Sequence, residues 1–383
     1  MRQKVEPTAP ADIATSIDAH RVRPDVDLER HCRNRQIELA TSLKGRKAIY
    51  LDIKFWIGIR DAQAISPSHH PYSALLVSLR EAVADGRAFC PISDSCFLEV
   101  FKQLDVDSRR RTVALIDELS LGVSIISLDI RISTEIAHLL HAALTPEQVY
   151  PLDHLVWTKL SYALGYFSPP VGMFDEHIGG AIEKAFFDHM WTIPLIEIES
   201  HIGDAMSTKD TGDNERLAHT LNQGIAEHAA GLKNFKQVYE HELVGVMDLY
   251  ASRAVDIVCN MAPPSLGPRP AKNTDRYKTI ERQCLNLLVG AMRLDKGKAT
   301  LRTLHIEASI HAAVRWSKGQ KFKANDFFDI HHAAAAVGYC DAFFTERSLA
   351  NVLTRSDLGL DKLYDCTVES NPEAALEYVQ VRV

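Results

Sequence analysis

Short apolar runs alternate with helix-like segments in the first third of the chain. The apolar runs cover 48–51, 88–93 and 123–128, and helical spacing or composition predicts helices around 75–83, 95–104 and 109–119. Strands separated by helices of this length are typical of right-handed βαβ units that build a parallel sheet. We therefore predict an α/β domain that starts near residue 45.

The alternation stops near residue 144 and returns near residue 317. Between these points the pattern predicts mostly helix, and after them it predicts a helix at 326–337, a strand at 342–345, a short helix at 347–353 and a strand near 364–368. We predict four segments: an N-terminal arm and helix (1–44), the first half of the α/β domain (45–144), a helical insertion (145–316) and the second half of the α/β domain (317–383).

Composition places the chain among globular proteins. Its 383 residues are 46% hydrophobic and 24% charged, which excludes disordered, collagen-like and disulfide-scaffold classes. The seven cysteines form no CxxC pair, and the sequence shows neither the apolar segment of a secretion signal nor an apolar run long enough to span a membrane. We expect a reduced, cytoplasmic protein without membrane contact, and we leave open a homo-oligomer or a regulatory protein partner.

Charge is unevenly distributed along the chain. The formal net charge of −7 argues against a protein that coats nucleic acid through its overall field. However, a stretch rich in Lys and Arg over 269–323 runs directly into one rich in Asp and Glu from Asp326 onward. A metal-dependent site that cleaves phosphate esters needs both kinds of charge, although two solvated surfaces would give the same pattern.

Six acids and one serine fall at the predicted strand ends or in the helices next to them: Asp52, Ser93, Glu99, Asp326, Asp329, Asp341 and Glu346. In an open parallel sheet, ligands bind beyond the carboxyl ends of the strands. Carboxylates brought together there repel one another unless a cation neutralises them. Mg²⁺ and Mn²⁺ prefer such oxygen ligands, and they can activate water and stabilise a leaving oxygen. The pattern therefore predicts a metal site suited to phosphodiester hydrolysis.

Each candidate acid also has an ordinary structural explanation. Asp52 can cap the turn that follows its strand, and Glu99 lies off the apolar stripe of its helix, where a solvated face is its ordinary setting. The helix dipole favours Asp326 and Asp329 in a first helical turn. An unpaired Asp within the apolar stretch around residue 52 is costly to bury, so we favour metal binding there.

Three parts of the sequence resemble PIN-domain nucleases. Residues 50–57 (Tyr-Leu-Asp-Ile-Lys-Phe-Trp-Ile) are similar to the family's opening strand, and residues 90–99 are similar to its second segment, a strand and a helix that carries Glu. Residues 325–345, with an Ala-rich helix and a following apolar strand that ends in Thr, resemble the region of its third and fourth acids. The resemblance implies a three-layer α/β/α domain with a central parallel sheet, here interrupted by the helical block.

The resemblance also implies Mg²⁺- or Mn²⁺-dependent cleavage of RNA. The implied catalytic metal ligands are Asp52, Glu99, Asp329 and Asp341, with Asp326 as a further ligand and Ser93, Thr345 and Glu346 in supporting positions. Many PIN proteins place an Asp just after the final Thr, whereas here Thr345 is followed by Glu346 and Arg347. The last ligand is therefore Asp341, Glu346 or both.

Basic residues near these acids are candidates for binding the RNA backbone: Lys321, Lys323, Arg109, Arg110 and Arg111. Two other functions are consistent with the same sequence. One is a non-catalytic PIN-like regulator that binds RNA or protein, and the other is a structure-specific deoxyribonuclease. Metal-dependent cleavage of RNA and of matched DNA separates the three.

Overall fold

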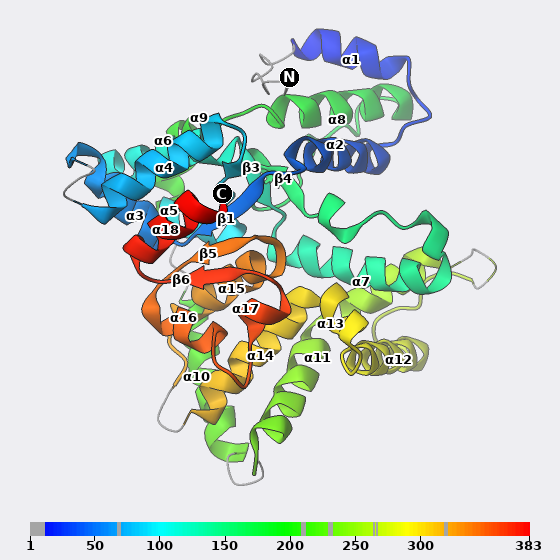
Figure 1. Cartoon of the computed structure of the whole chain (residues 1–383). Helices are drawn as coiled ribbons and strands as arrows, with labels where there is room; N and C mark the ends of the chain where they lie inside the picture. The colour runs from blue at the N-terminus through cyan, green and yellow to red at the C-terminus, as the bar shows by residue number, and fades with distance from the viewer. Residues whose placement is uncertain are drawn as a thin grey trace. The chain divides into compact units, whose positions relative to one another are not determined.

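The computed structural model describes residues 12–66, 70–207, 212–228, 233–262, 265, 267–317 and 321–383. The described chain is mostly helical with short strands (Figure 1). Its internal contacts define two compact units. Unit 1 takes in the described residues within Met1–Ser127, Asp153–Lys209 and Asn371–Val383, and unit 2 takes in those within Leu128–Leu152 and Asp210–Ser370.

Unit 1 combines helices with two pairs of strands. Its strands are β1 (Lys47–Leu51), β2 (Ala88–Phe89), β3 (Val123–Ile125) and β4 (Trp157–Lys159). Its α-helices are α1 (Ile13–Arg21), α2 (Leu28–Leu43), α3 (Ile53–Asp61), α4 (Pro71–Ala84), α5 (Asp94–Phe101), α6 (Val106–Ser120), α8 (Glu176–Met190), α9 (Leu195–Ser207) and α18 (Pro372–Arg382). Strands β1 and β2 pair in parallel, with Ala48 opposite Phe89, whereas β3 and β4 pair antiparallel.

The β1 strand contributes buried side chains to the unit 1 core. Ile49, Tyr50 and Leu51 are fully buried, because successive side chains of this strand are apolar on both faces. The strand ends at Asp52, whose carboxylate caps α3. The predicted pattern of buried strand, polar residue and helix is therefore present here.

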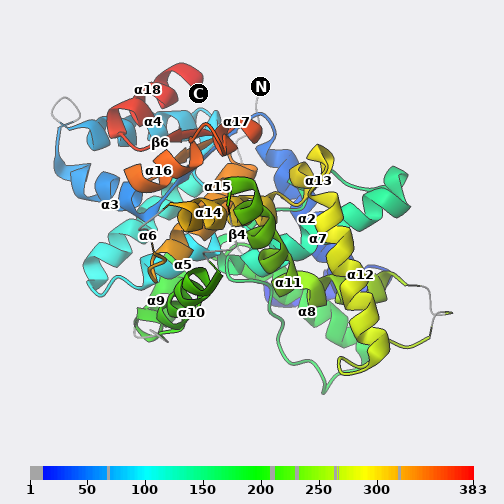
Figure 2. The ribbon, with the colours of Figure 1, turned by 90° about the horizontal axis from the view of Figure 1, so that it is seen from below.

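Unit 2 contains the remaining elements. Its α-helices are α7 (Leu128–Leu144), α10 (Asp213–His228), α11 (Phe235–Met261), α12 (Asp275–Ala291), α13 (Asp295–Thr300), α14 (Arg302–Trp316), α15 (Asp326–Tyr339), α16 (Arg347–Leu353) and α17 (Leu360–Leu363). Strands β5 (Ala342–Phe344) and β6 (Thr367–Glu369) pair in parallel, with Phe343 opposite Val368. Helices α11 and α12 lie side by side (Figure 2).

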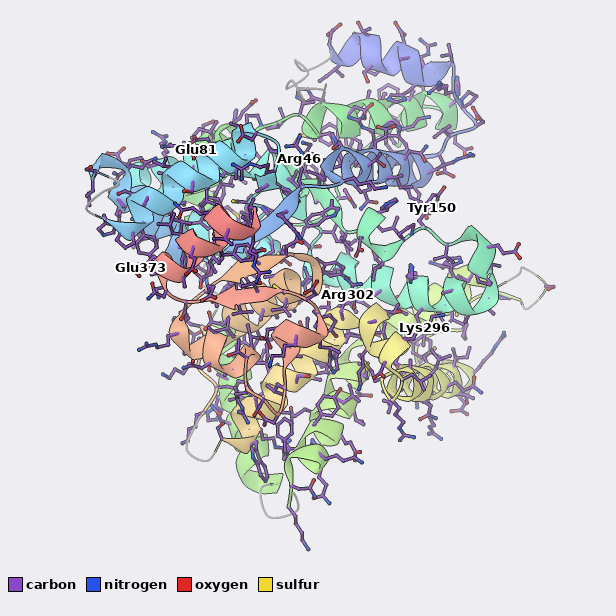
Figure 3. All side chains as sticks on the ribbon, in the orientation of Figure 1. Arg46, Glu81, Tyr150, Lys296, Arg302 and Glu373 are labelled. Atoms are coloured by element: carbon purple, nitrogen blue, oxygen red, sulfur yellow. The ribbon has the colours of Figure 1, made fainter. Side chains whose placement is uncertain are left out.

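Helix α15 is held close to α14. The side chains of 333–336, all alanines, are fully buried, and small side chains let two helices approach closely. Arg302 of α14, labelled in Figure 3, donates a hydrogen bond of 2.8 Å to the carbonyl of Gly338 and places its guanidinium 5.0 Å from the ring centre of Tyr339. Both contacts of Arg302 lie at the C-terminal end of α15, the helix that begins with Asp326.

The predicted fold class is confirmed at the level of a mixed α/β chain with parallel strand pairs. The two compact units do not follow the predicted boundaries, because 153–209 belongs to unit 1 and most of the predicted insertion belongs to unit 2. Strand β4 lies within the segment 145–316, where the sequence pattern indicated mainly helix. Within the described ranges, no helix is both long and apolar enough to cross a lipid bilayer.

Candidate active site

Asp52 directly follows the carboxyl end of β1, and Ser93 comes four residues after Phe89, the last residue of β2, which is shorter than the predicted strand 88–93. Asp52 is 6% exposed and accepts a hydrogen bond of 3.1 Å from the backbone N–H of Phe55, so it caps α3. Ser93 is fully buried and caps α5 by accepting from the backbone N–H of Cys96. Its Oγ also lies 2.6 Å from the hydroxyl of Tyr50, which ties β1 to the start of α5.

Besides burial, the charges of Glu99 and Asp52 both raise the pKa of the same thiol, that of Cys96. Burial raises the pKa of Cys96 well above its ordinary value, and the negative charges of Glu99 and then Asp52 raise it further. Electrostatic effects of this kind require that both carboxylates lie near the thiol. Both acids of unit 1 therefore act on one thiol, Asp52 from the end of β1 and Glu99 from within α5. Asp52 accepts the hydrogen bond from the backbone N–H of Phe55 through one carboxylate oxygen, Oδ1.

Unit 2 contains a cavity of about 460 Å³ that is lined by five of the predicted site residues: Lys321, Lys323, Asp326, Asp329 and Glu346. Its other lining residues are Ser348 and the apolar side chains Ile310, Val314, Ile330, Leu349 and Val352. Asp326 and Asp329 come from the first turn of α15, and Glu346 follows the carboxyl end of β5. The helix start and the strand end thus meet at one place, as the βα geometry requires.

Hydrogen bonds orient two of these carboxylates. Asp326 accepts a bond of 2.9 Å from the backbone N–H of Lys323, which closes the turn before α15. Glu346 accepts a bond from the hydroxyl of Ser348 at the start of α16. The cavity therefore combines three carboxylates with two ammonium groups, the charge types that bind a metal ion and a phosphate backbone.

Asp341 lies at the other end of α15 and β5. It precedes β5, whereas Glu346 comes after the strand, and α15 begins at the cavity and ends before Asp341. The 14 residues of α15 span about 21 Å at a rise of 1.5 Å per residue. Burial raises the pKa of Cys366, and the charge of Asp341 adds to this, so Asp341 lies near that thiol. The structure does not place Asp341 at the cavity.

The three arginines of α6 that we predicted to bind RNA differ in their exposure to solvent. Arg109 is 1% exposed, and its guanidinium is bonded to Glu199 at 2.9 Å and to Asp204 at 2.7 Å. Arg110 is half exposed and bonds Glu199 at 3.0 Å, while Arg111 is exposed on the surface. Arg109 is therefore not a phosphate-binding residue, because its buried guanidinium already donates to Glu199, Asp204 and the carbonyl of Gln103.

One group of potential metal ligands was not predicted from the sequence. Among the residues that the structure describes, only His20, His31 and Asp188 bring three ligand atoms within 4.8 Å of one another. They come from α1, α2 and α8. No spacing motif links them, since Asp188 is 157 residues from His31.

Comparisons of the chain with protein-family models, with curated proteins and with solved structures each found no match. The case for a function therefore rests on the residues and their geometry.

Proposed function

We propose that this chain is a PIN-like, metal-dependent ribonuclease that hydrolyses phosphodiester bonds. One observation carries the proposal: the unit 2 cavity gathers three carboxylates and two lysines from the start of α15, the end of β5 and the segment before α15. Helix dipoles or surface solvation explain single acids, but neither explains why both charge types line the same concave surface.

The donor atoms in the cavity fit Mg²⁺ or Mn²⁺. Carboxylate oxygens are the ligands that these hard cations prefer, and Mg²⁺ keeps several waters while it binds one or two carboxylates. The three cavity acids are not a compact three-ligand group, so they suit such a hydrated ion better than a closed cage. The buried Thr345 hydroxyl, next to Glu346, has no hydrogen-bond partner in the described structure, which leaves a polar group for an ordered water.

In this proposal Asp329 and Glu346 hold the metal from unit 2, and Asp326 assists them. The sequence resemblance implies Asp52 and Glu99 as metal ligands as well. A bound divalent cation lowers the pKa of a coordinated water and stabilises charge on the leaving oxygen. Lys321 and Lys323 bind backbone phosphates and so position the RNA strand.

The test is cleavage of a mixed RNA pool by the purified chain with Mn²⁺, with Mg²⁺ and with EDTA. We expect Asp329→Asn and Asp52→Asn to lower the cleavage rate by at least about 100-fold while circular dichroism is unchanged. Asp295→Asn is the matched control, because Asp295 occupies the first turn of α13 and is 97% exposed outside the cavity. Its rate should equal that of the unmodified chain.

Other outcomes would replace the proposal. Equal cleavage of matched single-stranded or flap-containing DNA would indicate a deoxyribonuclease. Binding of RNA without cleavage under any metal condition would indicate a non-catalytic regulator. Cleavage that survives Asp329→Asn would show that the cavity is not the site, and cleavage that survives Asp52→Asn would show that Asp52 is not a metal ligand.

A further inference from the structure

His20, His31 and Asp188 form a cluster that joins three helices of unit 1. The Nε2 of His20 lies 2.9 Å from Oδ2 of Asp188, and the Nε2 of His31 lies 2.9 Å from Oδ1 of the same carboxylate. The two imidazole rings meet edge to face, with centres 4.8 Å apart. Helices α1, α8 and α2 lie together in Figure 1, in agreement with their contacts.

The donor set is that of a transition-metal site. Two imidazole nitrogens and one carboxylate, with a water in the fourth position, are typical of Zn²⁺ sites that keep an open coordination position. The three side chains are 13%, 14% and 24% exposed, so the cluster is shielded without being sealed. Small shifts of the side chains would turn two hydrogen bonds to Asp188 into three bonds to one ion.

A second observation, independent of the cluster, also favours a cation. His20 lines a cavity of about 720 Å³ whose lining includes four carboxylates: Asp27, Asp175, Glu176 and Glu183. Lys184 is the one lysine among the lining residues. A concave surface with an excess of negative charge concentrates divalent cations next to His20.

Two cationic side chains lie near the cluster: Lys184 is bonded elsewhere, and Arg35 pairs with Asp188 itself. Lys184 is 3% exposed and donates to the backbone carbonyls of Arg23 and Val26, at 3.1 and 2.7 Å. Arg35 lies 3.4 Å from Oδ1 of Asp188 through its Nε. In many metal sites a residue that does not bind the metal itself holds a ligand carboxylate in orientation, as Arg35 does here.

The geometry points to one Zn²⁺ ion bound by His20, His31 and Asp188, with a water molecule as fourth ligand, that fixes α1 against α2 and α8. Helix α1 contributes no fully buried residue of its own, so apolar burial secures it only weakly. A metal bond through His20 would provide the missing attachment. This inference does not depend on the proposed nuclease activity.

The test measures metal binding by the whole chain after treatment with EDTA and dialysis. Isothermal titration with Zn²⁺ should show one tight equivalent, and Co²⁺ should give a visible absorption band that Zn²⁺ abolishes. His31→Gln and Asp188→Asn should weaken Zn²⁺ affinity at least tenfold and remove the Co²⁺ band. His177→Gln is the matched control, because His177 lines the same cavity but lies outside the cluster.

His20→Gln keeps the test decisive if the other variants fail to fold, because α1 buries no residue completely. In the unmodified chain Zn²⁺ should slow proteolysis near the α1–α2 connection, and this protection should disappear in His20→Gln. Zn²⁺ binding that is equal in the cluster variants and in His177→Gln would overturn the inference. A chain that binds neither Zn²⁺ nor Co²⁺ would overturn it as well. None of these readouts involves RNA.

Discussion

Arg109 and Glu199 form a buried ion pair with 2.9 Å between Nε and Oε1, and both side chains are 1% exposed. Removal of Arg109 leaves Arg110, at 3.0 Å, as the remaining ion-pair partner of the buried Glu199 carboxylate, so we expect Arg109→Ala to lower the free energy of unfolding by about 3 kcal/mol, the low end for a broken buried pair. Urea unfolding followed by circular dichroism measures this loss. Arg111→Ala, an exposed neighbour, should change the free energy by less than about 0.5 kcal/mol.

The same pair of variants separates a structural role from a role in RNA binding. The folded fraction of Arg109→Ala should bind RNA as the unmodified chain does. If Arg109→Ala instead unfolds at the same urea concentration as the unmodified chain but binds RNA less tightly, the guanidinium contacts phosphate, and our revision of the sequence prediction fails.

Glu135 makes the stability of unit 2 dependent on pH. Burial raises the pKa of its carboxyl group to about 7, although it accepts hydrogen bonds from Thr303 and Tyr339 and lies near Arg131. Its pKa in the unfolded chain is the ordinary 4.5, so the folded state holds the proton more tightly. The contribution of Glu135 to the free energy of unfolding is therefore fully present below pH 4.5 and is lost as the pH rises through about 7. The loss is about 3 kcal/mol.

Glu135→Gln tests this dependence, because a glutamine of the same shape accepts the hydrogen bond from Tyr339 without a charge. We expect the free energy of unfolding to fall by about 3 kcal/mol more in the unmodified chain than in the variant between pH 4.5 and pH 8. Other titrating groups are common to both chains and cancel in the difference. Parallel stability curves for the two chains across this range would contradict the assignment.

The sequence predicted features that depend on neighbouring residues. Asp52 and Ser93 were placed at strand ends because an apolar run followed by a polar residue and a helical pattern is a local signal. The start of α15 and the shared location of Asp326 and Asp329 follow from the same kind of signal. These local signals therefore identified the two acids at the start of α15 that line the unit 2 cavity.

Features that depend on distant residues were missed. The burial of Arg109 is determined by Glu199, which lies 90 residues further along the chain. The antiparallel strand β4 pairs with β3 inside a segment whose composition indicates helix. The His20, His31 and Asp188 cluster needs three helices that the sequence pattern does not pair. In each case the information lies in tertiary contacts, which override local propensity.

The geometry of unit 2 predicts which acid is the last metal ligand. Glu346 lines the cavity with Asp329, whereas Asp341 lies at the opposite end of β5. We therefore expect Glu346→Gln to lower metal-dependent RNA cleavage by at least about 10-fold, and Asp341→Asn to leave the rate within about twofold of the unmodified chain. Single-turnover cleavage rates over a range of Mn²⁺ concentrations measure the effect.

A higher Mn²⁺ requirement in Glu346→Gln would show that the loss comes from weaker metal binding. The reverse result, an inactive Asp341→Asn and an active Glu346→Gln, would restore Asp341 as the ligand. It would also show that the cavity does not bind the catalytic metal.

Lys321 and Lys323 should determine how strongly RNA binding depends on salt. Each phosphate that a protein neutralises on single-stranded RNA contributes about 0.7 to the slope of log affinity against log salt concentration. The double substitution Lys321→Gln/Lys323→Gln should therefore lower this slope by about 1.4 and raise KM, while kcat stays nearly constant because the metal ligands remain. Fluorescence anisotropy with a labelled RNA between 50 and 200 mM salt, roughly the range over which this effect is large, measures the slope.

The matched control for this double variant is Lys278→Gln/Lys296→Gln. Both control lysines are exposed residues of unit 2 that lie outside the cavity, so the control removes the same two charges from the protein. If the two double variants lower the slope equally, the effect comes from the overall field of the protein. A different result is that only the cavity variant changes the slope, while kcat falls by as large a factor as KM rises. The lysines would then act on the reacting phosphate itself and have a catalytic role.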